Sequence, residues 1–303
     1  MTALAVESGQ VAAARRAVRR RHLQHVPYLV PLLASLLIWV YGPLAATGVL
    51  SLVRWDLTGP ATFVGLANYR ALLADPAFVT AAGQTVLYAA GMLPLAVGLP
   101  LVLAIALWGR PGRAASVYRC LLFVPMVLAP VATAISWQFV LNPLQGVLRG
   151  LLGTSTPDLL GDPRTALWTV DVITSGKMIA LNVLLFSAAL AAIDPATVEA
   201  ARVDGASQRQ ITWRVVVPQL ARSIVLLAML TVVYAGQWSF TNIAVLTQGG
   251  PQHSTDNVYY RLYTYGFTYF DVGKASAGAV LVVLALAIPL GLGGLLRRTR
   301  DAR

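Results

Sequence analysis

The sequence predicts an all-α integral membrane protein with six transmembrane helices, both termini in the cytoplasm and a helical loop on the cytoplasmic face. Three observations support this fold class. Only 12% of the 303 residues are charged and 57% are hydrophobic, whereas about a quarter of the residues in soluble domains are charged. Apolar runs of roughly 20 residues, long enough to span a bilayer, recur along the chain. The net charge of +11 falls on alternate segments between these runs.

Each apolar run is interpreted as one span. The first is longer than the 7–15-residue core of a signal peptide and follows about 27 other residues, so we expect it to be retained. Pro94 and Pro100 in the second run should kink the helix or interrupt its hydrogen bonds locally; the third run contains Pro125 and Pro130. The spans are placed at 28–52, 80–107, 118–141, 172–193, 220–246 and 274–296.

The segments outside the spans divide the chain into a basic arm at 1–27, a six-span domain at 28–296 and a tail at 297–303. One side of the membrane receives the arm, the turn near residue 110, the loop 194–219 and the tail. This side carries sixteen of the 23 Lys and Arg residues and five of the twelve acids, so it holds the whole net charge. The other side has seven of each, counting Lys177 and Lys274 at span ends. Because Lys and Arg accumulate in cytoplasmic loops, the basic side is the cytoplasmic one. The charge therefore indicates topology and not nucleic-acid binding.

Several site types are excluded or disfavoured by the sequence. The single cysteine, Cys120, excludes a disulfide framework and a cysteine-based zinc site, and the three histidines offer no metal-ligand spacing. Gly176 and Lys177 are followed by Met178, so the phosphate-binding motif of P-loop ATPases is missing. Five tyrosines and two phenylalanines lie within residues 259–270 on the outer side, where they fit an interfacial belt or the cover of a cavity.

The cytoplasmic loop 194–219 has the signals of two short helices. Asp194 before Pro195 is typical of a helix start, and Gly205 is typical of a helix end. A second helix is expected from Ser207 to Val216, followed by Pro218. Small side chains at Ala200 and Ala201 would allow another surface to approach closely.

This loop resembles the EAA loop of the permease subunits of binding-protein-dependent ABC importers. The resemblance rests on Glu199, Ala200 and Ala201, on Gly205 after three intervening residues, and on the ending Val215-x-Val217-Pro218. The family pattern usually ends Ile-x-Leu-Pro, so valine replaces both aliphatic residues. The proline that often follows four residues later is Arg222 here.

Further matches across residues 28–296 resemble the sugar-permease branch of maltose-type importers. They are Phe63 to Tyr69 with Asp75 to Phe78, Asn242 with Val245 to Pro251, and Gly273 to Ala277. Gln84 stands where asparagine is usual.

The resemblance implies that the loop docks as a coupling helix into a groove of a separate cytoplasmic ABC ATPase. The ATPase would bind ATP and Mg²⁺, with no cofactor in this chain, and its closure would rock the spans between inward-open and outward-open states. Two copies of the ATPase, a second homologous permease and an external solute-binding protein would complete the importer in the cell membrane; no nucleic acid is implied. The alternative is that Glu199 and Asp204 are solvated surface charges. The residues assigned to coupling are Glu199, Ala200, Ala201, Asp204, Gly205 and Pro218.

The fifth span carries the residues proposed to line a substrate pathway. Polar groups in a span usually face the bundle interior or a pathway, and tyrosine and tryptophan rings beside hydroxyl and amide groups suit a sugar. The alternative is that the same residues hold helices together. The resemblance adds Met178, Leu181 and Asn182 of the preceding span, all more weakly than the residues of span five. The span-five residues are Thr231, Tyr234, Gln237, Trp238 and Asn242.

Two other classes of protein are alternatives to the importer subunit. An ion-coupled secondary transporter would need acidic residues within the spans and broken helices in matched halves, for which the prolines are the only indication. A membrane-embedded enzyme or scaffold would need a nucleophile, base or metal-ligand set that the sequence does not offer. The net charge of the outer segments is zero, which favours a neutral solute over a phosphorylated one.

Overall fold

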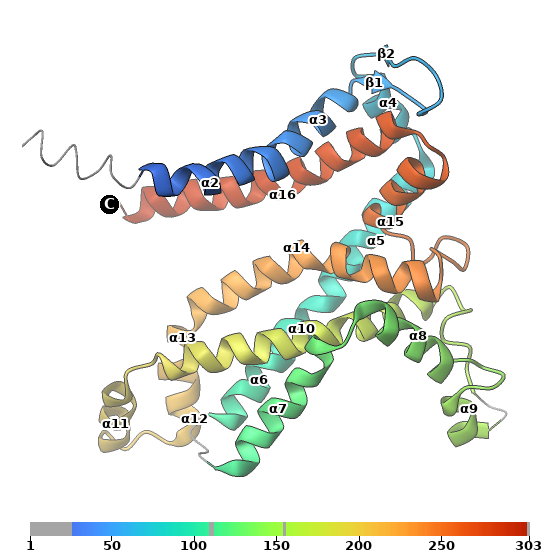
Figure 1. Ribbon diagram of the computed structural model, residues 1–303. Helices are drawn as coiled ribbons and strands as arrows, with labels where there is room; N and C mark the ends of the chain where they lie inside the picture. The colour runs from blue at the N-terminus through green and yellow to red at the C-terminus, as the bar shows by residue number, and fades with distance from the viewer. Residues whose placement is uncertain (1–25, 109–111, 154–155, 302–303) are drawn as a thin grey trace, which may run out of the picture.

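The computed structural model describes residues 26–108, 112–153 and 156–301, so most of the expected basic arm at 1–27, part of the turn near 110 and the end of the tail lie outside the described residues. Within these ranges the chain is almost entirely helical (Figure 1). In chain order the elements, with η marking π-helical segments, are α2 (Val26–Leu36), η1 (Leu37–Tyr41), α3 (Gly42–Leu50), β1 (Val53–Arg54), β2 (Thr62–Phe63), α4 (Ala67–Leu73), α5 (Pro76–Leu93), η2 (Pro94–Gly98), α6 (Leu99–Leu107), α7 (Arg113–Val127), α8 (Pro130–Val140), α9 (Val147–Leu152), α10 (Ala166–Ala191), α11 (Pro195–Val203), α12 (Gln208–Gln210), η4 (Ile211–Val216), α13 (Val217–Gln219), α14 (Ala221–Leu246), α15 (Val258–Tyr263), η5 (Thr264–Thr268) and α16 (Val272–Asp301).

The helices form two groups. The terminal pair consists of the α2–η1–α3 helix and α16, which run side by side (Figure 1). The central bundle consists of α5–η2–α6, α7, α8, α10 and α14; here α10 packs on α6, α7 and α14, and α14 packs on α5 and α8. Helix α15 lies between the two groups and contacts α5, α14 and α16.

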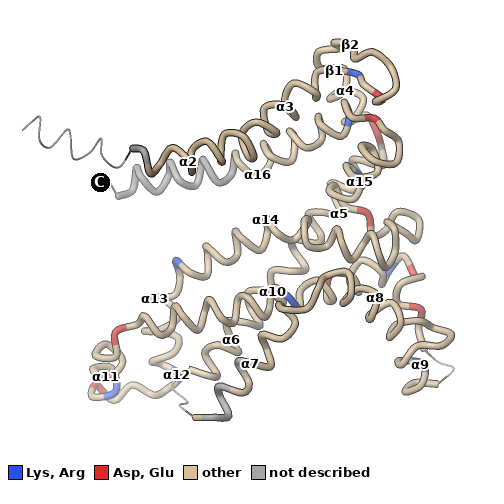
Figure 2. The backbone as a smooth tube through the Cα atoms, in the orientation of Figure 1, with Lys and Arg blue, Asp and Glu red and all other residues tan. Residues whose placement is uncertain are grey.

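Four helices in the described residues are long and apolar enough to cross a membrane: Tyr28–Leu50, Pro76–Leu107, Ala166–Ala191 and Ala221–Leu246. They correspond to the expected spans one, two, four and five. Charged residues gather near the helix ends, and the stretches between them are mostly uncharged (Figure 2). None of the apolar window of Tyr28–Leu50 is buried inside the chain, so this helix must find its apolar contacts in lipid or in another protein.

The expected third span, 118–141, is broken. The helices Cys120–Val127 and Pro130–Val140 meet at an angle of 101°. The backbone of Leu128 and Ala129 is extended, with ψ of 138° and 130°. The break occurs at Pro130, where the proline ring disfavours the helical conformation of the residue before it and supplies no N–H to the preceding helix.

The second span contains the interruption of its α-helical hydrogen bonds that its prolines predict. It continues from Pro76 to Leu107, but the α-helical pattern changes to a π-helical one over Pro94–Gly98 and resumes at Leu99. The missing N–H of Pro94 removes one bond of the α-helical ladder, and the wider turn accommodates the loss.

The fourth span begins earlier than the expected 172–193. Helix α10 starts at Ala166, so Asp171 and Lys177 lie within the helix and not in an outer segment or at a span end. The side chain of Asp171 is packed between α5 and α10 and is only 1% exposed. A Cβ on Gly91 would collide with this carboxylate and with the Trp168 ring, so glycine at 91 permits the close approach of the two helices.

Helix α16 extends from Val272 to Asp301, beyond the expected span 274–296, and Val272–Ile288 is its apolar part among residues whose side chains are described. The outer aromatic segment forms helix α15 and the π-helical segment η5. Tyr260, Tyr263 and Phe267 stack in sequence, with ring centroids 6.5 and 5.2 Å apart, and Tyr263 also meets Phe240 of α14 at 5.5 Å.

The outer end of the terminal pair is closed by β1, β2 and α4. The strands pair antiparallel, Val53 opposite Phe63 and Arg54 opposite Thr62. The buried amide of Asn68 donates to the carbonyls of Ser51 at 2.9 Å and Val53 at 2.8 Å, which fixes the turn after α3.

We predict that Asn68→Ala destabilises this outer end by about 1–3 kcal/mol, because two carbonyls lose their donor in a buried position. The measurement is the thermal unfolding midpoint of the detergent-purified protein. Arg70→Ala is the matched control, since Arg70 is exposed on the same helix. Equal midpoints for the two variants would contradict the assigned role of Asn68.

Candidate functional site

The loop between α10 and α14 begins with the expected helix. The backbone N–H of Ala196 donates to the Asp194 carboxylate at 2.9 Å, and Pro195 occupies the first turn of α11. A carboxylate at this place satisfies a helical N–H that has no partner within the helix. The helix start predicted from Asp194 and Pro195 is therefore confirmed.

Gly205 ends this helix as predicted. Its φ is +77°, a left-handed conformation that residues with a side chain resist. The N–H of Gly205 donates to the carbonyl of Arg202 and the N–H of Ala206 to that of Ala201, both at 3.0 Å. A Cβ at position 205 would meet no atom within 4 Å, so only the backbone conformation calls for glycine.

The second helix of the loop also forms, although most of it is π-helical. Ser207 and Gln210 make a capping box, in which the Ser207 N–H donates to the Gln210 side chain at 2.7 Å. The π-helical segment Ile211–Val216 follows and passes into α13, which contains Pro218.

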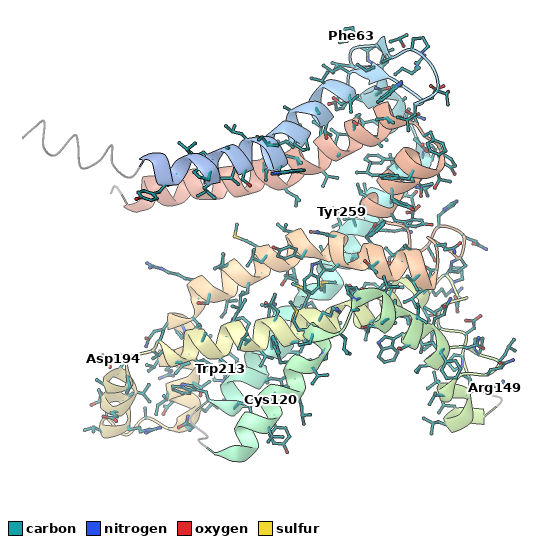
Figure 3. All side chains as sticks on the ribbon, in the orientation of Figure 1. Phe63, Cys120, Arg149, Asp194, Trp213 and Tyr259 are labelled. Carbon is teal, nitrogen blue, oxygen red and sulfur yellow. The ribbon has the colours of Figure 1, made fainter. Side chains whose placement is uncertain are left out.

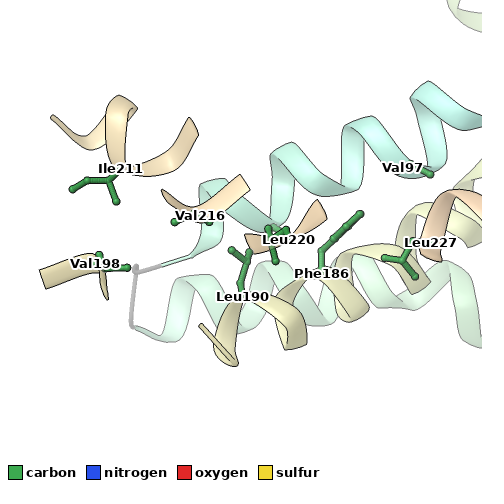
Figure 4. Close-up of a cluster of buried hydrophobic side chains, with 9 residues drawn as sticks. Val97, Phe186, Leu190, Val198, Ile211, Val216, Leu220 and Leu227 are labelled. Carbon is green, nitrogen blue, oxygen red and sulfur yellow. The ribbon is translucent and has the colours of Figure 1, made fainter. Parts of the chain in front are cut away.

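One face of the loop is anchored to the end of the central bundle (Figure 4). Val198 of α11 is 6% exposed and belongs to the same core cluster as Ile211 and Val216 of the loop. Its other members come from η2, α6, α10, α13–α14 and their junctions: Val97, Ala104, Phe186, Leu190, Leu220 and Leu227. The two loop helices are therefore packed on the ends of the spans.

The opposite face of the loop is open. Glu199, Ala200, Asp204, Gly205 and Pro218 are exposed. Ala201 differs from the others, since it is half-buried against the core of this chain.

Two exposed apolar side chains accompany these residues and were not singled out in the sequence: Val203, 87% exposed, and Trp213, 59% exposed. The signal available in the sequence was Trp213, a large apolar residue among charged and polar residues of a basic loop. In Figure 3, Asp194 and Trp213 lie at one end of the molecule, with Phe63 and Arg149 toward the other.

A cavity of about 440 Å³ lies beside the break between α7 and α8. Helices α8, α10 and α14 complete its wall. Its size is within the range of sites for small molecules. It is lined by Met126, Val127, Leu128, Ala129, Pro130, Thr133, Ile173, Thr174, Lys177, Gln237, Trp238, Thr241 and Asn242.

Three of the predicted span-five residues line this cavity: Gln237, Trp238 and Asn242. Tyr234 does not line it, but its ring lies 5.9 Å from that of Trp238, tilted by 48°. The amide of Asn242 also donates to the hydroxyl of Thr174 at 2.8 Å and so joins α14 to α10.

Thr231 and Asn182 occupy the bundle interior and not the cavity wall. Asn182 donates to the Thr231 hydroxyl at 3.3 Å and to the carbonyl of Ala96, and both side chains are 1% exposed or less. These contacts tie α10 to α14 and to η2, which is the helix-joining role that the sequence left as an alternative. Met178 packs with Met92, Ala96 and Ala235, away from the cavity.

Lys177 is the cavity residue that the sequence interpretation missed. Its ammonium donates to the carbonyl of Leu128, at the C-terminal end of α7. A second cavity of about 690 Å³ adjoins the first and shares Leu128, Thr133, Ile173 and Lys177 with it. The sequence did contain a signal for this residue, a lysine inside an apolar run. Lys177 was assigned to a span end because the span was predicted to begin six residues after the start of helix α10.

The outer segment after α14 is held by a compact polar cluster. Arg261 pairs with the buried carboxylate of Asp256 and lies 3.2 Å from Nδ1 of His253. Burial raises the pKa of the Asp256 carboxyl above its ordinary value, although the charge and hydrogen bond of the Arg261 guanidinium oppose this shift. The Tyr88 hydroxyl of α5 donates to the carbonyl of Thr255 at 2.9 Å. The cluster fixes this segment against the central bundle.

Comparison with known proteins gives one consistent result. Residues 22–300 match the family described as "binding-protein-dependent transport system inner membrane component". Over 271 residues the sequence is 34% identical to the sn-glycerol-3-phosphate transport system permease protein UgpA of Brucella abortus, covering 88% of this chain and 92% of the relative. It is 33% identical over 275 residues to the probable ABC transporter permease protein YurN of Bacillus subtilis, covering 88% of this chain and 94% of the relative.

Solved structures share the fold. A chain of a bacterial alginate ABC transporter, solved with a periplasmic protein carrying an alginate pentasaccharide, superposes with a TM-score of 0.79 at 21% identity, covering 94% of this chain and 97% of the other. A chain of the MetNI methionine ABC transporter gives a TM-score of 0.54 at 17% identity, covering 77% and 98%.

We predict that Val198→Ala loosens the loop by about 1–3 kcal/mol, because it removes buried methyl groups from the contact with Leu190 and Ile211. Hydrogen–deuterium exchange over residues 195–219 should become roughly tenfold faster. Val203→Ala provides the control, as the same change on the exposed face of the same helix. Equal exchange in the two variants would show that Val198 does not anchor the loop.

Proposed function

Because the chain belongs to the family of inner membrane components of binding-protein-dependent transport systems, and is thus a permease subunit of an ABC importer, we propose that it translocates a sugar or a related small hydroxylated solute. A separate ATPase supplies the energy by docking on the loop 194–219. The observation that carries this proposal is the two-faced loop: one face is anchored on the ends of α10 and α14, and the other presents Glu199 and Asp204 outward.

The coupling residues have the surroundings that docking requires. Glu199 is exposed on α11 and free to pair with a basic group of the ATPase. Gly205 sets the angle between α11 and the second loop helix through its positive φ. Val203 and Trp213 add exposed apolar surface beside these residues, as in a helix-in-groove contact. Ala200 belongs to the docking face, whereas Ala201 keeps α11 close to the bundle.

The assembly we propose contains a second homologous permease, two copies of a cytoplasmic ABC ATPase that binds ATP and Mg²⁺, and an external solute-binding protein. The exposed apolar surfaces of α2 and α3 support a neighbour in the membrane, either lipid or the second permease. An ion-coupled secondary transporter, the alternative considered from the sequence, does not agree with the family of this chain.

The topology we propose has six spans with both termini in the cytoplasm. The four long apolar helices supply four of them, the bent pair α7–α8 supplies the third along the chain, and α16 supplies the last. The excess of Lys and Arg in the loop 194–219 supports placing this loop inside.

For the solute, the cavity at the α7–α8 break offers one aromatic ring, Trp238, together with the amides of Gln237 and Asn242 and several threonine hydroxyls. This mixture fits a hydroxylated solute, with hydrogen bonds to its hydroxyl groups and an apolar ring against its carbon frame. Several relatives are named for transport of sn-glycerol 3-phosphate, which is such a solute.

We predict that Glu199→Ala lowers ATP-dependent uptake roughly tenfold or more in proteoliposomes that contain the whole transporter, because a charged partner at the ATPase interface is lost. The amount of permease in the membrane should not change. Thr197→Ala, exposed on the same helix, is the control. Unchanged uptake by Glu199→Ala would remove the coupling assignment.

We further predict the sidedness of two exposed positions in a Cys120→Ala background. Thr58→Cys should react with a membrane-impermeant maleimide added to intact spheroplasts. Ser207→Cys should react only after the membrane is opened. Labelling of Ser207→Cys in intact spheroplasts would overturn the proposed orientation.

A further inference from the structure

Lys177 lies near the middle of the 26-residue helix α10 and faces the cavity at the α7–α8 break. A charged side chain inside a membrane-spanning segment is costly unless it has a partner or a function. Lys177 takes part in none of the ion pairs found among the described residues, and no Asp or Glu of the described chain lines the cavity. The cavity therefore has an uncompensated positive charge.

One contact of the ammonium is made within the chain. It donates to the carbonyl of Leu128, just after the last turn of α7, where the break leaves helical carbonyls without an N–H partner. An ammonium group has three donors, so two remain for other acceptors. The contact also holds the ammonium at the cavity wall.

The rest of the wall is polar but uncharged. The Nδ2 of Asn242 donates a hydrogen bond to the Thr174 hydroxyl. The side-chain oxygen of Asn242 can therefore accept a hydrogen bond from a solute hydroxyl. The hydroxyls of Thr133 and Thr241 and the amide of Gln237 line the same space. These groups suit the hydroxyl part of a solute, and only Lys177 distinguishes a neutral solute from a charged one.

We propose that Lys177 is the specificity-determining residue of the cavity and binds an anionic group, phosphate or carboxylate, on the hydroxylated solute. This inference rests on the proposed function. An anion supplies the counter-charge that the cavity lacks, and a charge-assisted hydrogen bond is stronger than a neutral one. Trp238 and the uncharged polar groups then hold the hydroxylated carbon frame.

A purely structural role for Lys177, as a donor to the end of α7, makes a different prediction. Lys177→Gln keeps a donor that can reach the Leu128 carbonyl but removes the charge. If the charge binds the solute, this variant folds and assembles normally and loses the preference for anions. Lys177→Arg keeps the charge and retains that preference.

The test measures binding to the purified whole transporter in detergent, without the solute-binding protein, by equilibrium dialysis. The probes share one carbon frame: sn-glycerol 3-phosphate, D-glycerate and glycerol. The phosphate and the carboxylate should each bind the wild type more tightly than glycerol, and the stronger of the two identifies the anion. Lys177→Gln should weaken binding of the preferred anion roughly tenfold to a hundredfold, with little change for glycerol. Equal binding of all three probes to the wild type, or no binding of either anion, overturns the proposal, as does an unchanged affinity of Lys177→Gln for the preferred anion.

The second lysine of the chain provides a matched control. Lys274 lies in the first turn of α16, 3.7 Å from Asp271, and outside the cavity. Lys274→Gln should bind every probe as the wild type does. In the wild type, the preferred anion should also protect Lys177, and not Lys274, from acylation by acetic anhydride, as read by mass spectrometry. Equal protection of both lysines would contradict the proposal.

The outcome is separable from that of the proposed function. If Lys177→Gln binds and transports as the wild type does while Glu199→Ala abolishes ATP-dependent uptake, the importer stands and the role of Lys177 is wrong. If the wild-type complex contains no ATPase and shows no ATP-dependent uptake, the proposed function itself fails.

Discussion

The absence of water from the hydrocarbon core of a membrane is the constraint on which this fold depends. Every backbone N–H and C=O within the core must be paired inside the protein, so the chain crosses in long helices. Where a proline removes a helical hydrogen bond, either the helix changes its hydrogen-bond pattern or another part of the chain supplies a partner. At Pro94 the helix widens into a π-helical turn and continues. At Pro130 the helix breaks, and Lys177 of the neighbouring helix supplies a donor to the carbonyl of Leu128.

Helices α10 and α14 connect the loop 194–219 with the cavity. Helix α10 carries Thr174 and Lys177 in its middle and ends just before the loop, while α14 begins just after the loop and carries Gln237, Trp238 and Asn242. Val198, Ile211 and Val216 of the loop share a core cluster with Leu190 of α10 and Leu227 of α14. Under the proposed function, an ATPase that displaced the loop would therefore move the two helices that form walls of the cavity.

The polar residues of these helices perform two tasks. Asn182 and Thr231 are buried and join α10 to α14, whereas Gln237 and Trp238 face the cavity. Asn242 does both, through its bond to Thr174 and its place in the wall. Thr231, Tyr234, Trp238 and Asn242 recur at intervals of three and four residues and therefore share one face of α14, but this face crosses from the packed interior to the cavity along its length. Spacing alone could not separate the two environments.

The sequence by itself determined the features that depend on local chemistry and on hydrophobic length. The long apolar helices, the departure from α-helix at Pro94, the cap at Asp194 and the left-handed Gly205 all follow from properties of a few adjacent residues. The tertiary structure decided what depends on neighbours from distant parts of the chain. Asp171 could be placed inside a helix only because Gly91 of another helix leaves room for it, and Lys177 entered the cavity because Pro130 breaks the helix opposite. These outcomes are set by packing between segments far apart in sequence, which no local pattern records.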